Sequence, residues 1–307
     1  MTLDDTLIAF ILDQRLKGNT DKTIKGYKGF LGRFITWLRG NNVIMLEDLT
    51  LQHVQQYQLY IDIKPSETCA GKKLTKRTVQ TYMRHIKVFL KFCHKEGYML
   101  EPIHEKVKLP KAERPVIEIL TDEEIEVILA TFTKSESGLR NKALIYLMLD
   151  SGLRLSEVSG IKTSNINFDR GYLKVFGKGR KERIVPLGLK VRRAMLAYVH
   201  KRRAADELED DQYFFLTKER KPLTPDCVRN LMGRLKKKTG ISRLHAHLFR
   251  HTFATNFLVY GLGDVYELSR LLGHSQLQIT EKYLQLASYY TILEKRRKTS
   301  YLDLRRR

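Results

Sequence analysis

The chain has 307 residues, of which 42% are hydrophobic, and this length suits about two globular domains with ordinary cores. Its 56 Lys and Arg against 34 Asp and Glu leave a formal net charge of +22, which favours a polyanionic partner, with nucleic acid as the first candidate. The acidic N-terminus lacks the apolar core of a signal peptide, and no stretch approaches ~18 consecutive apolar residues, so we expect a cytoplasmic protein without a membrane partner.

Neither a disulfide framework nor a metal site is predicted. The cysteines are odd in number, widely spaced and without a CxxC pair: Cys69, Cys93 and Cys227. Such thiols are typical of a reduced cytosolic protein. The histidines of the C-terminal part lack an H-E-x-x-H or CxxC arrangement: His245, His247, His251 and His274. We therefore expect no cofactor and no metal ion.

Amphipathic helices are predicted in the N-terminal third of the chain. Apolar residues recur there at three- and four-residue spacing behind capping residues, which is typical of helices with one buried face. The stripes are Ile24, Tyr27, Leu31, Phe34 and Leu38 behind Thr20; Val54, Tyr57 and Ile61; and Val79, Tyr82, Met83, Ile86, Leu90 and Cys93 behind Thr75. Residues 1–106 are therefore expected to form a small helical domain.

Basic residues cluster on and just before the third of these helices: Lys72, Lys73, Lys76, Arg77, Arg84, Lys87 and Lys91. A basic helix face neutralises phosphates without reading the base sequence. A charged face that is merely solvated is the alternative. The motifs farther along the chain favour contact with DNA.

A change of pattern marks a boundary at residues 107–119. Apolar periodicity is lost there, and Pro110 and Pro115 prevent a helix from continuing, so this segment is predicted to be a linker. Beyond it, Thr121 and Glu124 form a capping box, and the apolar run 143–149 predicts a buried helix that ends near Gly152. Residues 120–290 are expected to form a second domain. Two lobes on a short tether can close around a duplex as a C-shaped clamp.

The strongest strand signals flank a glycine-rich turn. Residues 172–176 and 183–187 are β-rich runs on either side of Gly177-Lys178-Gly179-Arg180-Lys181-Glu182, which predicts a hairpin. Helices are expected to follow through Leu286. The fold is therefore predicted to be mainly α with a small antiparallel β-sheet.

Residues 291–307 are predicted to form a basic C-terminal tail. A tail that only contacts DNA is one interpretation, since its cations add phosphate contacts. We favour a tail that is exchanged between protomers, because it also carries apolar residues that need a hydrophobic partner: Tyr301, Leu302 and Leu304.

Side chains suited to phosphodiester chemistry follow one another in the second domain. Arg154 and Glu157 lie in Gly-Leu-Arg-Leu-Ser-Glu, Lys178 lies between two glycines, His247 and Arg250 lie in His-Leu-Phe-Arg, His274 ends Leu-Leu-Gly-His, and Tyr283 stands nine residues later. Each element alone is a weak signal, and the glycine-flanked lysine is not a Walker loop, because the G-x-x-x-x-G-K-[ST] pattern is absent. In this order and spacing the seven residues resemble the signature of the tyrosine recombinase family, which includes phage-type integrases and Xer recombinases.

The resemblance implies how the cations and the phenol act. Arg154 and Arg250 bind the non-bridging oxygens of a DNA phosphodiester, as bidentate guanidiniums can. Tyr283 attacks the phosphorus, and cations help its phenol, whose ordinary pKa is about 10. Lys178 protonates the leaving 5′-oxygen, with Lys181 as its competitor.

The remaining residues support that chemistry. The resemblance assigns His247 to hydrogen bonding or general base work, and His274 to a second hydrogen bond to the phosphate. Glu157 orients the basic residues. Arg180, in the hairpin turn, is an expected DNA contact. His251 is not selected by the spacing and is expected to be structural.

The resemblance also implies an activity. Family members cleave one strand through a 3′-phosphotyrosine, exchange strands through a Holliday junction, and use neither ATP nor an obligatory metal. We expect a helical core-binding (SAM-like) domain over 1–106 and a catalytic domain over 120–290, without room for a further N-terminal arm-site domain. A tetramer on double-stranded DNA with inverted-repeat core sites is expected in the nucleoid, with accessory DNA-bending or cell-division proteins as possible partners.

Within the family, chromosome dimer resolution, integration of a phage or conjugative element, and transposition all stay open. Two alternatives lie outside recombination. A type IB topoisomerase shares the phosphotyrosine chemistry, and a DNA-binding regulator can keep the fold without cleaving.

Overall fold

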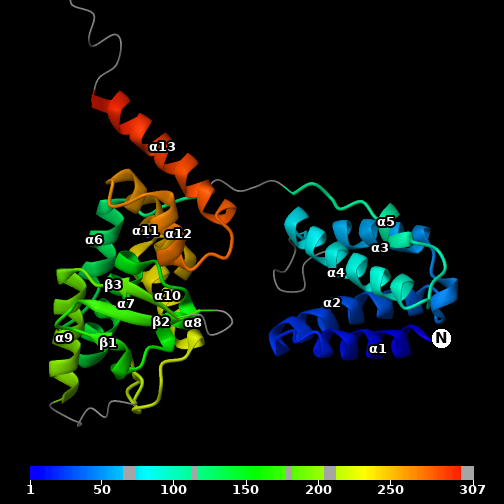
Figure 1. Ribbon diagram of the computed structural model, residues 1–307, viewed down its shortest axis with the longest axis horizontal. Coiled ribbons are helices and arrows are strands. Elements are labelled where there is room, and N and C mark those ends of the chain that lie inside the picture. Colours follow the sequence, from blue (N-terminus) through cyan, green and yellow to red (C-terminus); the bar gives the residue numbers. More distant parts are fainter. Residues whose placement is uncertain (65–72, 113–116, 178–181, 204–211, 299–307) are drawn as a thin grey trace, which may run out of the picture. The chain divides into compact units, whose positions relative to one another are not determined.

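Two compact units make up the chain, Met1–Pro115 and Val116–Arg307, in the computed structural model (Figure 1). The structure describes residues 1–64, 73–112, 117–177, 182–203 and 212–298. Each unit has its own hydrophobic core. The described part of the predicted linker, residues 107–112 and 117–119, contains no helix or strand. None of the helices among the described residues is long and apolar enough to cross a membrane.

The N-terminal unit is a helical bundle. Its elements are α1 (Leu3–Leu16), α2 (Asp21–Gly40), the 3-10 turn η1 (Leu46–Asp48), α3 (Leu51–Ile63), α4 (Lys76–Lys95) and α5 (Ile103–Lys106). Each of the four long helices begins after a threonine whose hydroxyl accepts a hydrogen bond from the backbone N–H three residues later: Thr2, Thr20, Thr50 and Thr75. These hydroxyls satisfy amides that have no partner within the helix.

The three predicted stripes form the core of this bundle. Their residues are buried, except for Tyr27, which is partly buried against the same core. Helix α1 was not predicted from the sequence. Its apolar residues lie on both faces, because Ile8, Leu12 and Leu16 are exposed while Phe10 and Ile11 are buried, so its sequence lacks a clear helical period.

The second unit combines helices with one small sheet. Its helices are α6 (Asp122–Ala130), α7 (Glu136–Ser151), α8 (Leu155–Ser159), α9 (Leu189–Arg203), α10 (Pro225–Thr239), α11 (Ala246–Val259), α12 (Val265–Leu272) and α13 (Gln278–Lys298), with a 3-10 turn η2 (Thr163–Asn165). Its strands are β1 (Ile166–Asn167), β2 (Tyr172–Phe176) and β3 (Glu182–Pro186), antiparallel in the order β1-β2-β3. The mainly α fold with a small antiparallel sheet is thus confirmed.

The predicted hairpin is β2 and β3, with Leu173 opposite Val185 and Phe176 opposite Glu182. The second strand begins one residue earlier than predicted. Strand β1 was not predicted, because two residues carry no detectable alternation.

Helix α7 is the centre of this unit and contacts α9 and α11. It ends at Gly152, whose φ of 57° is left-handed and favours glycine. A Cβ at this position would overlap the ring of Phe253. The tight end of α7 therefore brings α11 close to Gly152.

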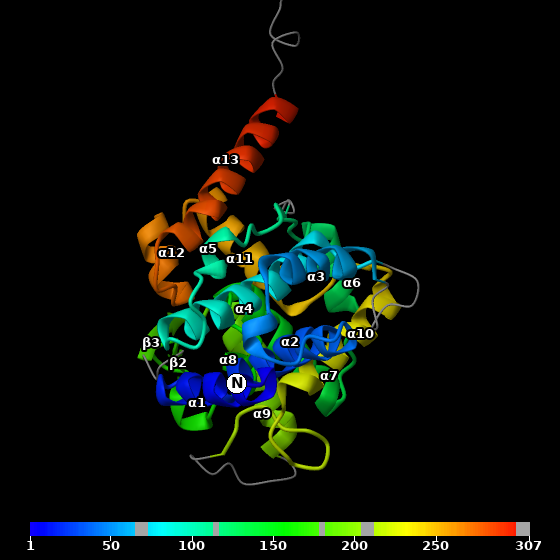
Figure 2. The ribbon, with the colours of Figure 1, turned by 90° about the vertical axis from the view of Figure 1, so that its right-hand side faces the viewer.

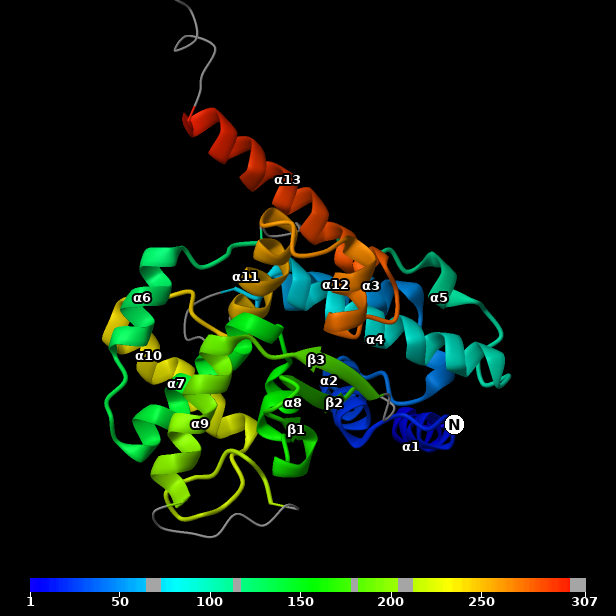
Figure 3. The same cartoon turned by 60° about the vertical axis from the view of Figure 1, so that its left-hand side comes forward.

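Helix α13 starts against α11 and α12 and then runs away from the rest of its unit in every view (Figure 1, Figure 2, Figure 3). It continues to Lys298. The prediction that helices end near Leu286 was wrong, because Ala287 is still buried and the helix continues beyond it. Its outer part exposes Tyr289, Ile292 and Leu293.

Candidate active site

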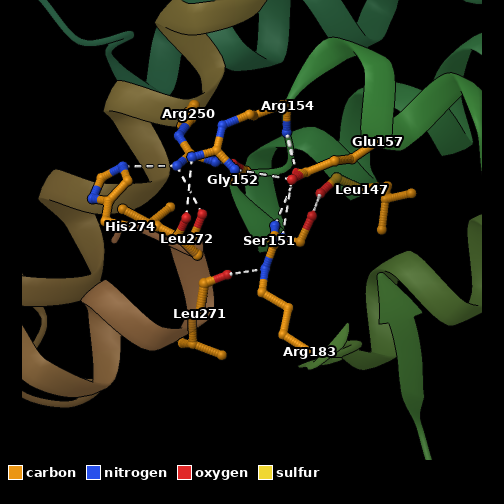
Figure 4. A network of polar contacts seen from close by, with 11 residues as sticks. Leu147, Ser151, Gly152, Arg154, Glu157, Arg183, Arg250, Leu271, Leu272 and His274 are labelled. Carbon is orange, nitrogen blue, oxygen red and sulfur yellow. Dashed lines mark hydrogen bonds and ion pairs between the residues drawn. The ribbon is translucent and has the colours of Figure 1, made fainter. Parts of the chain in front are cut away.

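Three arginines converge on the C-terminal end of α12, as Figure 4 shows. Arg183 Nε donates to the carbonyl of Leu271 (2.7 Å), Arg250 Nη2 to that of Leu272 (2.9 Å), and Arg154 Nη2 to that of Gly273 (3.2 Å). The last carbonyls of a helix have no partner within the helix and carry the negative end of its dipole. Three successive carbonyls therefore orient three guanidiniums that would otherwise repel one another.

Arg250, on α11, is the most enclosed of these arginines, with 4% of its surface exposed. Its Nη1 donates to the carbonyl of Gly152 at 2.7 Å, so the guanidinium joins the ends of α7 and α12. Burial and the nearby Arg154 lower the pKa of Arg250 to about 10. The group is still charged at neutral pH.

Glu157 is a buried carboxylate shared by two arginines. It accepts from Arg183 Nη1 and Nη2 at 3.0 and 2.8 Å, and from the amide and Nη1 of Arg154 at 2.8 and 3.0 Å. Burial alone would raise the pKa of Glu157, but the hydrogen bonds from Arg183 and Arg154 outweigh it and leave the pKa lowered. Glu157 thus holds the side chain of Arg154 from one side while α12 holds it from the other.

Arg183 was missed by the sequence analysis. It lies on β3, two residues before the buried Val185 and therefore on the same face of the strand. A charged residue at a core-facing strand position was the available signal, since such a charge needs a buried partner.

Replacing Glu157 by Gln should destabilise the protein by about 3–5 kcal/mol at neutral pH, because Arg183 would lose its buried partner. Glu157 has a lowered pKa in the folded state, so its contribution is present above the unfolded pKa of about 4.3 and is lost as pH falls through the folded pKa. The difference in unfolding free energy between wild type and Glu157→Gln, measured by urea unfolding, should therefore become smaller at acidic pH.

Glu126→Gln is the matched control, because Glu126 is exposed on α6 and its change removes the same charge. Its unfolding free energy should stay close to that of wild type at each pH. If Glu157→Gln lowers the unfolding free energy equally at neutral and acidic pH, the lost ion pair is not the cause of the destabilisation.

His274 follows α12 and is held at both ring nitrogens. Its Nε2 lies 2.8 Å from Arg250 Nη2, and its Nδ1 lies 2.8 Å from the hydroxyl of the buried Thr280. Since a guanidinium only donates, Nε2 accepts and Nδ1–H donates to Thr280. Burial and Arg250 lower the pKa of His274 to about 4, so the ring is neutral at neutral pH.

Tyr283, on α13, is buried, with 1% of its surface exposed, against Phe253, Phe257 and Leu268. Burial raises the pKa of its phenol, although Arg250 and Arg154 act in the opposite direction. Its oxygen lies 2.8 Å from Nδ1 of His251.

His247 and His251 differ in their contact with the phenol. His247 lies on α11 and is exposed, and its ring forms no hydrogen bond to another described residue. His251, expected to be structural, contacts Tyr283 directly. The four-residue offset from His247 puts both histidines on one side of α11, and this was the signal that could have found His251.

A cleft of about 1100 Å³ lies beside this network. Arg154, Arg183 and His274 line it, together with Gly177 and Glu182 of the predicted hairpin. Lys178, Arg180 and the competitor Lys181 are outside the described residues, and so is Lys72 of the N-terminal unit.

The described members of the predicted basic face lie on or next to α4. Lys73, Arg77, Arg84 and Lys91 are exposed. Two others are engaged: Lys76 pairs with Asp62 at 2.6 Å, and Lys87 Nζ donates to the carbonyl of Val107 at 3.1 Å. Arg77, Arg84 and Lys91 recur every seven residues and so share one face of the helix.

Comparison with known proteins gives matches to both units. The model of the phage integrase family matches residues 118–289, and that of the phage integrase SAM-like domain matches residues 6–109. Tyrosine recombinase XerC of Bacillus licheniformis is 33% identical over 288 residues, which cover 92% of this chain and 91% of that protein.

Solved structures share the fold at lower identity. The Tn1549 transposon integrase in complex with transposon right end DNA has a TM-score of 0.73 at 18% identity, covering 98% of this chain and 100% of that one. The XerH site-specific recombinase bound to a palindromic difH substrate, a post-cleavage complex, has a TM-score of 0.70 at 18% identity, covering 89% and 79%.

Proposed function

Since the chain belongs to the phage integrase family and is a tyrosine-type site-specific DNA recombinase, we propose that Tyr283 is its nucleophile and forms a 3′-phosphotyrosine with one DNA strand. The observation that carries this assignment is the surroundings of the phenol, which lies against Arg250 and His251 beside the arginine cluster. A phenol needs nearby cations and a proton acceptor to attack a phosphodiester.

Arg154 and Arg250 bind the non-bridging oxygens of the scissile phosphate. Contacts to described residues use two of the five N–H groups of Arg154, at Glu157 and Gly273, and leave three for an anion. Its side chain is 34% exposed, so a phosphate can reach it. His247, exposed on the same side of α11 as His251, is suited to donate to the same phosphate.

The general acid is assigned to Lys178. The assignment rests on its Gly-Lys-Gly position and on the anchoring of its hairpin, because Arg183 ties β3 to Glu157, which also holds Arg154. Gly177 and Glu182, on either side of residues 178–181, line the same cleft as Arg154 and Arg183. Arg180 in the same turn is proposed to contact DNA.

Lys178→Ala should slow cleavage of an ordinary duplex strongly, about 10²–10⁴-fold, because the leaving 5′-oxygen lacks its proton. A duplex with a 5′-bridging phosphorothiolate should restore the rate, since sulfur leaves without a proton. Rates are measured in single-turnover cleavage. If the phosphorothiolate rescues Lys181→Ala and leaves Lys178→Ala slow, the acid is Lys181.

The N-terminal unit is proposed to be the core-binding domain, with Lys73, Arg77, Arg84 and Lys91 neutralising DNA phosphates and Lys72, Lys76 and Lys87 nearby. Arg84→Gln should reduce the slope of log affinity against log salt by about 0.9, the value for one phosphate contact. Lys76→Gln should change the slope less, because Asp62 already pairs with Lys76. Equal slopes for Arg84→Gln and wild type would exclude Arg84 from the contact.

Strand exchange requires a second site and more than one protomer. We propose a tetramer on two duplexes with inverted-repeat core sites, a Holliday junction between the two exchanges, and action at the chromosome in the cytoplasm. The XerH complex, with its palindromic substrate, supports this symmetry. The exposed Tyr289, Ile292 and Leu293 on α13 suit a C-terminal segment that packs on a neighbouring protomer.

The test begins with duplexes selected from a random pool by binding to the protein. A nicked suicide version of a selected site should trap a covalent protein–DNA adduct, and a plasmid carrying two such sites should yield recombinants. Binding without any adduct would make the chain a regulator. Relaxed plasmid without exchanged sites would make it a topoisomerase.

A further inference from the structure

The phenol of Tyr283 and the ring of His251 form a closed pair. The phenol oxygen lies 2.8 Å from Nδ1, the two rings are 5.6 Å apart between centroids, and the tyrosine is 1% exposed. His251 projects from α11 and Tyr283 from α13, helices that pack on each other. A buried hydroxyl must donate its hydrogen to some acceptor, and Nδ1 is in position to receive it.

From this geometry we propose that His251 takes the proton of Tyr283 when the phenol attacks DNA. The inference rests on the proposed function, because it requires Tyr283 to be the nucleophile. A candidate base must first lie within hydrogen-bond reach of the proton that it accepts. His251 meets this requirement at 2.8 Å.

The other two site histidines are placed for different work. His247 is exposed, and its ring centroid is 6.3 Å from that of His251. His274 is engaged by Arg250 at Nε2 and by Thr280 at Nδ1. His247 is therefore accessible to a DNA phosphate, whereas His251 contacts the hydroxyl of Tyr283 inside the protein.

The surroundings keep the proton on the phenol until DNA arrives. The charged and titratable groups around His251 are Lys282 and Tyr283 of α13 together with His245, His247 and Arg250. Burial and then Lys282 lower the pKa of His251 to about 4, and burial raises the pKa of Tyr283. A bound phosphate adds a negative charge that offsets Lys282 and Arg250, which favours an imidazolium at His251.

Two proton transfers accompany the attack on phosphorus. The proton moves from the phenol oxygen to Nδ1 of His251, whose other hydrogen is on Nε2. The phenol oxygen forms a bond to phosphorus, the bond from phosphorus to the 5′-oxygen breaks, and the general acid gives that oxygen a proton. In rejoining, the 5′-hydroxyl attacks, its proton returns to the acid, and the imidazolium returns its proton to the phenol.

The test is single-turnover cleavage of a nicked suicide duplex by His251→Asn. The Oδ1 of asparagine can accept the hydrogen bond from Tyr283 but cannot take its proton. We expect DNA affinity close to that of wild type and cleavage slowed about 10²–10⁴-fold. The variant rate should keep rising with pH, as hydroxide replaces the base, whereas the wild-type rate should level off once His251 is neutral. His200→Asn, which changes an exposed histidine on α9 outside the site, is the matched control and should cleave like wild type.

A second variant separates proton transfer from positioning. Tyr283→3,5-difluorotyrosine has a more acidic phenol and depends less on a base. The fold-loss of cleavage caused by His251→Asn should therefore be at least ten times smaller in this background than in wild type. An unchanged penalty, or wild-type cleavage by His251→Asn, would leave His251 a positioning residue only. If His251→Asn does not fold, His251→Gln and the fluorotyrosine protein carry the same comparison. Wild-type protein that forms no adduct would overturn the proposed function instead.

Discussion

Tyr283→Phe should form no covalent adduct with a nicked suicide duplex while binding that duplex almost as tightly as wild type. The change removes one neutral oxygen, since burial raises the pKa of the phenol and keeps it protonated at neutral pH. Loss of the hydrogen bond to His251 should cost only about 1 kcal/mol of folding stability. Denaturing gels measure the adduct, and gel shifts measure the affinity.

Tyr290→Phe is the control for this experiment. Tyr290 lies on the same helix, two turns farther along and about 10 Å away at 1.5 Å per residue, and its ring neighbours that of Tyr289. It should form adducts at the wild-type rate. Adducts with Tyr283→Phe and none with Tyr290→Phe would move the nucleophile to Tyr290.

The parts of the fold that the sequence predicted are those with a repeating local signal. The stripes of α2, α3 and α4 repeat at the helical period, and β2 and β3 alternate around a glycine-rich turn. Helix α1 was not predicted because Ile8, Leu12 and Leu16 are exposed on its outer face. The extension of α13 beyond Leu286 was not predicted because Tyr289, Ile292 and Leu293 are exposed, so no buried stripe marks this part of the helix.

The sequence predicted the side chains of the site that belong to recognisable motifs, but not the backbone groups that position them. Arg154, Glu157, Arg250 and His274 come together as hydrogen-bonded neighbours (Figure 4). The carbonyls of α12 that orient the arginines leave no mark in the sequence, because every residue has a carbonyl. Arg183 and His251 contact partners 26 and 32 residues away, so a local pattern can mark each residue but cannot identify its partner.

Arg154→Lys should slow cleavage by about 10²–10³-fold, the cost of removing one preorganised donor from a developing oxyanion, although the charge is kept. An ammonium cannot reproduce the planar fork that meets Glu157, Gly273 and a phosphate together. Because the side chain is 34% exposed and lysine can still pair with Glu157, the unfolding free energy should change by less than about 1 kcal/mol. Single-turnover cleavage and urea unfolding measure the two effects.

Arg250→Lys should slow cleavage as much as Arg154→Lys does and should also lower the unfolding free energy. The carbonyls of Gly152 and Leu272 and Nε2 of His274 all accept from Arg250, whose surface is 4% exposed, and one ammonium cannot reach all three. Each buried acceptor left without a donor costs about 1–3 kcal/mol, so unfolding should become easier by several kcal/mol. Near-normal cleavage in either variant would remove that arginine from the site. Equal stability of the two variants would contradict the role of Arg250 in joining α7 to α12, because Arg250, unlike Arg154, donates to carbonyls at both helix ends.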